Sequence, residues 1–99
     1  MKERILDTDK FLYQFVGGEY HGKLWHYAAL EARNIITGYS DDLSAKRAAG
    51  VLCKRAELDN QPLVKGYYPP MYNGTKEVDG VTYTVIRYES PEAYAQYSI

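Results

Sequence analysis

The sequence has almost no cysteine and no long hydrophobic run. Cys53 is the single cysteine among 99 residues, and one thiol cannot form a disulfide within the chain, which is typical of a reducing compartment. After the charged start MKERILDTDK, the apolar stretch Phe11–Val16 ends at Gly17 and Gly18. It is too short for a secretory signal core or a membrane span. We therefore expect a cytoplasmic protein without a membrane partner.

The chain also lacks an excess of charge of either sign. It carries 12 Lys and Arg against 13 Asp and Glu, for a formal net charge of −1. This balance argues against binding of nucleic acid through bulk charge, and equally against an acidic mimic of DNA. With 45% hydrophobic and 25% charged residues, the composition is that of a globular protein. The length predicts one small domain over residues 1–99.

No motif for catalysis, metal binding or phosphate binding stands out. His21 and His26 are five positions apart, so on one helix they would point about 140° away from each other and could not share a metal. A second cysteine for a zinc site is missing, and Cys53 is expected to behave as a small hydrophobic residue. The glycines of residues 17–22 lack the spacing of a phosphate loop. We predict no cofactor, no metal and no enzyme activity; a cleft placing a histidine beside Glu31 or Cys53 is what would favour an enzyme.

Two amphipathic helices are predicted in the first half of the chain. In Lys23–Gly38, helical spacing places the apolar residues on one arc of roughly 140°, and Gly38 stands where a C-terminal cap is expected. The second predicted helix covers residues 39–59, with Ser40 as its N-cap and an alanine-rich inner face. We expect the two helices to pack as an antiparallel pair. The apolar arc of the first helix consists of Leu24, Trp25, Ala28, Ala29, Ala32, Ile35 and Ile36.

The second half of the chain reads as β-structure. Val81–Tyr88 is rich in β-branched and aromatic residues, and Asp79-Gly80 before it predicts a hairpin in which Val78 faces Val81. A third strand is needed for stability: the candidates are Leu63–Tyr67 and Phe11–Val16, and the latter fits a strand or a short helix. Ser90 followed by Pro91 opens a short C-terminal helix that runs to about Tyr97.

Together these elements predict an α+β domain. Two central antiparallel helices are expected to pack on one face of a small, mainly antiparallel sheet. The C-terminal hairpin and the short C-terminal helix complete the expected fold.

Tyrosine is the residue type that the chain has in excess. It occurs 11 times, against 1 Trp and 2 Phe, and tyrosine is enriched at binding surfaces because it joins apolar area to a polar tip. The segment GYYPPMYNGT, residues 66–75, holds three tyrosines on a proline-stiffened backbone. Either its rings fill the core, or they anchor a partner. The predicted binding residues are Lys65, Tyr67, Tyr68, Tyr72 and Asn73, and a secondary basic face consists of Lys46, Arg47 and Lys54.

Two functions fit these observations. The first is a non-enzymatic binding protein that acts by contact with another protein, as an inhibitor, an adaptor or an accessory subunit of the kind that phages and mobile elements encode. The alternative is a nucleotide-binding or nucleic-acid-binding domain, in which the tyrosines stack on bases and Lys65 and the helix cations contact phosphates.

Overall fold

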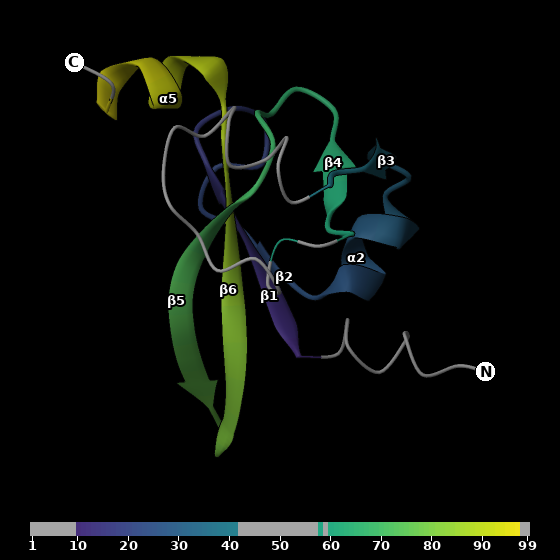
Figure 1. Ribbon diagram of the computed structural model, residues 1–99, viewed down its shortest axis with the longest axis vertical. Helices are drawn as coiled ribbons and strands as arrows, with labels where there is room; N and C mark the ends of the chain where they lie inside the picture. The colour runs from purple at the N-terminus through teal and green to yellow at the C-terminus, as the bar shows by residue number, and fades with distance from the viewer. Residues whose placement is uncertain (1–9, 42–57, 59, 98–99) are drawn as a thin grey trace.

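The structure, a computed structural model, describes residues 10–41, residue 58 and residues 60–97 (Figure 1). Strands dominate the described part of the chain, and the helices there are short. In chain order the elements are β1 (Phe11–Val16), β2 (Leu24–Trp25), α2 (Tyr27–Ala32), β3 (Ile36–Tyr39), β4 (Pro62–Val64), β5 (Met71–Val78), β6 (Val81–Glu89) and α5 (Pro91–Tyr97).

The strands form two sheets. The larger sheet has the order β2-β1-β6-β5, and the smaller one pairs β3 with β4. Strand β1 runs parallel to β6, with Phe15 opposite Tyr88, whereas β2 and β5 pair antiparallel to their neighbours. The stretch Phe11–Val16, which the sequence left open between strand and helix, is therefore a strand. The candidate stretch Leu63–Tyr67 overlaps β4, which belongs to the smaller sheet.

The predicted helix over Lys23–Gly38 is wrong in most of its length. Only α2 is helical, and a strand lies on each side of it. Leu24 pairs with Gln14 of β1, so a tertiary contact overrides the helical pattern. The helix ends at Ala32, and Asn34, the residue after its C-cap Arg33, has a left-handed φ of 56° and thus takes the capping role expected of Gly38. The β-branched residues that follow Asn34 favour the extended strand β3.

The predicted pair of central helices is not the architecture of this chain. The described residues form a mixed four-stranded sheet and a two-stranded sheet with two short helices. Residues 42–57, which hold most of the second predicted helix, lie outside the described residues. Leu58 is described, and its side chain is fully buried. No helix within the described residues is long and apolar enough to cross a bilayer.

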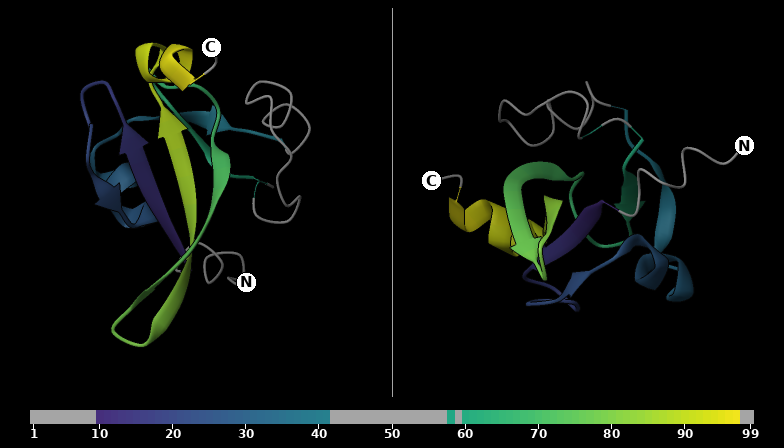
Figure 2. Two further views of the ribbon diagram at one scale, coloured as in Figure 1. Left: turned by 90° about the vertical axis from the view of Figure 1, so that its left-hand side faces the viewer. Right: turned by 90° about the horizontal axis from the view of Figure 1, so that it is seen from below.

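The C-terminal hairpin and helix are confirmed. Val78 faces Val81, and the turn residues Asp79 and Gly80 have φ values of 51° and 82°, as a two-residue hairpin turn requires. The hairpin projects beyond the other strands (Figure 2), because β1 begins opposite Thr84 and leaves the tip without a third strand. At the opposite end of β6, Ser90 Oγ accepts a hydrogen bond from the backbone N–H of Ala93 at 3.2 Å. Ser90 thereby caps α5.

The core lies against one face of β1 and β6. Phe15 stacks on Tyr88, with ring centroids 5.1 Å apart and planes 11° apart. The phenol of Tyr13 donates to Gln61 Oε1 at 2.7 Å, and that of Tyr88 donates to the carbonyl oxygen of Pro62 at 2.6 Å. Burial raises the pKa of both phenols above the ordinary value of 10.0. The buried hydrophobic cluster consists of Tyr13, Phe15, Leu30, Ile35, Leu58, Val64, Ile86 and Tyr88.

Candidate functional site

The segment at residues 66–75 divides between the interior and the surface. Tyr67 serves the interior: its phenol donates to the carbonyl oxygen of Gly17 at 2.6 Å and accepts from the N–H of Tyr20 at 2.9 Å. The ring packs edge-on against Phe15 at 5.1 Å, and burial is the largest cause of its raised pKa. Tyr67 thus ties the β1–β2 loop to the core.

Tyr68, the next residue, points outward. Its side chain is 38% exposed, and it packs edge-on against Tyr94 of α5, with ring centroids 4.7 Å apart and planes 88° apart. The backbone N–H of Tyr68 donates to the carbonyl oxygen of Glu89 at 3.0 Å. Pro69 is half-buried and Pro70 is buried. Tyr68 is therefore an exposed ring on a backbone that is fixed on both sides.

The remaining predicted binding residues lie on other elements. Tyr72 and Asn73 belong to β5 rather than to a loop; Tyr72 is half-buried opposite Ile86. The Asn73 amide donates to Gln14 Oε1 at 2.7 Å. Lys65 is exposed in the turn after β4. The basic face of Lys46, Arg47 and Lys54 lies outside the described residues.

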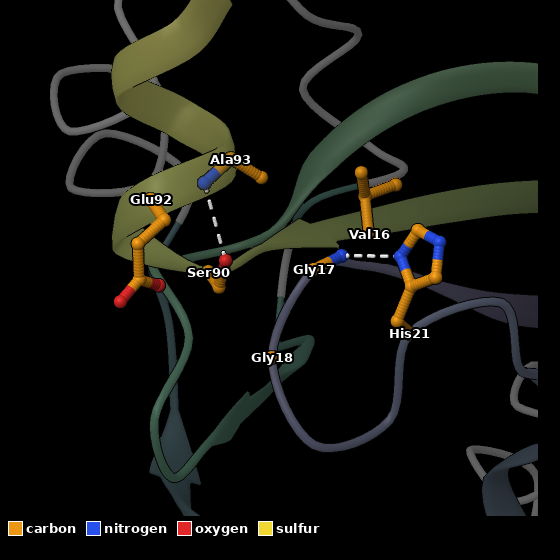
Figure 3. A pocket seen from close by; sticks show the side chains of 7 residues that line it. All are labelled: Val16, Gly17, Gly18, His21, Ser90, Glu92 and Ala93. Carbon is orange, nitrogen blue, oxygen red and sulfur yellow. Dashed lines mark hydrogen bonds between the residues drawn. The ribbon is translucent and has the colours of Figure 1, made fainter.

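A hollow lies at the end of the sheet where α5 begins, and Ala93, the residue before Tyr94, is part of its lining. It measures about 520 Å³. One wall is the β1–β2 loop, and the other wall is the first turn of α5 (Figure 3). The two walls meet because β1 and β6 run parallel and end side by side, with Val16 opposite Glu89. The lining residues are Val16, Gly17, Gly18, His21, Ser90, Glu92 and Ala93.

The loop wall of the hollow is held in one conformation by its own contacts. The N–H of Gly17 donates to His21 Nδ1 at 2.7 Å, so the neutral imidazole carries its proton on Nε2. Gly17 and Gly18 have φ values of 80° and 70°, which glycine adopts at little cost. A Cβ on Gly18 would come within 2.8 Å of the phenol oxygen of Tyr67. The glycines therefore allow the loop to approach both Tyr67 and α5.

The polar groups of the hollow are few and mostly engaged. Ser90 Oγ accepts the cap hydrogen bond of α5, and His21 Nδ1 accepts from Gly17. Glu92 is exposed. Outside the hollow, the His26 ring packs edge-on against Tyr83 at 5.4 Å. Within the described residues, there is no group of three or more His, Cys, Asp or Glu side chains that could hold a metal ion.

Sequence reasoning put forward Tyr68 as one of five binding residues and did not predict the hollow. The signals for its walls were present as a Gly17-Gly18 pair and a Ser90-Pro91 helix start, but nothing local indicates that they meet. The chain was also compared with protein-family models, curated proteins and solved structures, and none of the three comparisons found a match. The geometry of the site is therefore the basis for a proposal of function.

Proposed function

We propose that the protein is a non-enzymatic, cytoplasmic binding protein that acts by contact with another protein, as an inhibitor, an adaptor or an accessory subunit. The proposed contact surface is the α5 end of the molecule. It comprises the ring pair of exposed Tyr68 and half-buried Tyr94, together with the hollow between the β1–β2 loop and α5.

One observation carries this proposal: Tyr68 keeps 38% of its surface exposed while its position is fixed. The edge-on contact with Tyr94 and the backbone hydrogen bond to Glu89 hold it from two directions. A ring that is already ordered loses little conformational entropy when a partner covers it. Exposed, pre-ordered tyrosines are typical anchors of protein interfaces.

The same helix links the ring pair to the hollow. Tyr94 lies one position after Ala93, which lines the hollow. An aromatic anchor beside a concave surface is the arrangement in which interface anchors fill pockets on both partners. Lys65, one of the cations put forward for nucleotide contact, is on a separate turn from the ring pair. Its separation supports a protein partner over a nucleotide.

The test is an affinity capture with two matched variants. Tyr68→Ser removes the exposed ring, and Tyr39→Ser removes an equally polar-tipped ring, 55% exposed, from strand β3. We expect the wild type and Tyr39→Ser to retain the same protein from cells, and Tyr68→Ser to lose at least about tenfold, since anchor residues contribute roughly 2 kcal/mol or more. Circular dichroism and thermal unfolding confirm that each variant is folded.

Three outcomes would count against the proposal. Retention of the partner by folded Tyr68→Ser removes the ring from the contact surface. Equal loss in both variants shows a general effect of removing tyrosine rather than a site at α5. Retention of nucleotide or oligonucleotide in place of protein, with release at raised salt, supports the nucleotide-binding alternative instead.

A further inference from the structure

We infer that the hollow between the β1–β2 loop and α5 receives an arginine side chain of the partner. This inference rests on the proposed function, because it names the chemistry of the group that the same surface would take. The lining of the hollow and the charges around it support this inference.

The floor of the hollow suits an aliphatic stem. Val16 and Ala93 supply methyl groups, and Gly17 and Gly18 expose backbone without side chains. In Figure 3 these residues lie between Glu92 at one end and His21 at the other. The three methylenes of an arginine would lie on apolar surface while the guanidinium reaches the rim.

The charge of the lining favours a cation. Glu92 is the one Asp, Glu, Lys or Arg among the lining residues, and it is exposed. Glu19, in the loop wall, is also exposed. The nearest arginine on β6, Arg87, has its Nη2 atom 3.0 Å from Glu89 Oε2, so its charge is compensated.

Arginine fits this surface better than a neutral or acidic group. A planar guanidinium forms paired hydrogen bonds with a carboxylate, a geometry that a lysine ammonium does not offer. An acidic side chain would be repelled by Glu92, and an apolar one would leave that carboxylate without a partner in a closed interface.

The experiment uses the whole protein and two amino-acid amides of nearly equal shape. N-acetyl-L-arginine amide is titrated against the ¹⁵N-labelled protein, and N-acetyl-L-citrulline amide, which lacks the charge, is the matched probe. We expect the arginine amide to shift the backbone signals of Gly17, Gly18 and Ala93, and to bind more tightly than the citrulline amide. Removing the carboxylate by Glu92→Gln should weaken the arginine amide roughly two- to fivefold and leave the citrulline amide unchanged.

Glu77→Gln, on the exposed part of β5, is the control for loss of one negative charge and should leave both titrations unchanged. Equal binding of the two amides, or shifts that lie away from the hollow, overturns the inference. The absence of any shift also overturns the inference. If Tyr68→Ser still loses the captured protein in that case, the proposed function stands without the arginine inference. If the arginine amide binds at the hollow while Tyr68→Ser still captures the protein, the proposed function fails, but the hollow is still a site that binds an arginine side chain.

Discussion

The two ends of strands β1 and β6 have different surroundings. At the α5 end, Phe15 and Tyr88 stack in the core, and Tyr67 fixes the β1–β2 loop through two hydrogen bonds. At the other end, the hairpin β5–β6 continues alone, and residues 75–82 are all exposed. The first end depends on contacts between distant parts of the chain, whereas the second depends on the turn and on strand pairing. Most of the packing energy should therefore come from the α5 end, where side chains are ordered by tertiary contacts.

Removal of a core aromatic ring should cause the largest loss of stability. Phe15→Ala should lower the free energy of unfolding by about 3–5 kcal/mol, because the ring contacts Tyr20, Trp25, Tyr67 and Tyr88. Urea unfolding measures the change.

Val81→Ala, at the hairpin tip, is the matched substitution for Phe15→Ala. Val81 is 48% exposed, so the loss should stay below about 1 kcal/mol. Similar losses for the two variants would show that the tip is as tightly packed as the core, contrary to the comparison.

Alkaline pH should lower the free energy of unfolding through the buried phenols of the core. The pKa values of Tyr13 and Tyr88 are raised above 10.0 in the folded protein, chiefly by burial. Their neutral forms therefore contribute stability that is fully present below the unfolded pKa and is lost as the pH rises through the folded pKa. Above about pH 10, each phenol should lower the free energy of unfolding by about 1.4 kcal/mol per pH unit.

Urea unfolding between about pH 9 and about pH 11 measures this slope. Tyr88→Phe removes one of the titrating phenols, so its slope should be shallower than that of the wild type by up to about 1.4 kcal/mol per pH unit. A stability that stays constant over this range in the wild type would contradict the burial of the two phenols.

The elements that sequence reasoning predicted correctly are the ones that local chemistry decides. Asp79-Gly80 fixes the hairpin, and Ser90-Pro91 begins α5, whatever the rest of the chain does. The helix over Lys23–Gly38 failed because Leu24 and Trp25 pair with β1. Helical spacing along a single segment cannot reveal such a pairing.

The candidate site shows the same limit. The composition of residues 66–75 put Tyr67 and Tyr68 forward alike as binding residues; in the structure Tyr68 is exposed and Tyr67 faces the core. Which of two adjacent tyrosines faces out depends on the parallel pairing of β1 with β6, which places Gly17 within reach of one phenol. The hollow depends on the same pairing, and no local sequence pattern predicts that pairing.

Two glycine substitutions, one at each end, separate backbone strain from close approach. Gly18 and Gly80 have similar φ values of 70° and 82°, so alanine should cost about 1–2 kcal/mol at either position through the left-handed backbone. At Gly80 an added Cβ would meet no atom within 4 Å, but at Gly18 it would lie 2.8 Å from the Tyr67 phenol oxygen. That oxygen is held by two hydrogen bonds, so it cannot move without breaking them. Gly18→Ala should therefore be less stable than Gly80→Ala by about 1 kcal/mol or more. Equal stabilities by urea unfolding would mean that the loop moves freely away from Tyr67, and that the wall of the hollow is not fixed.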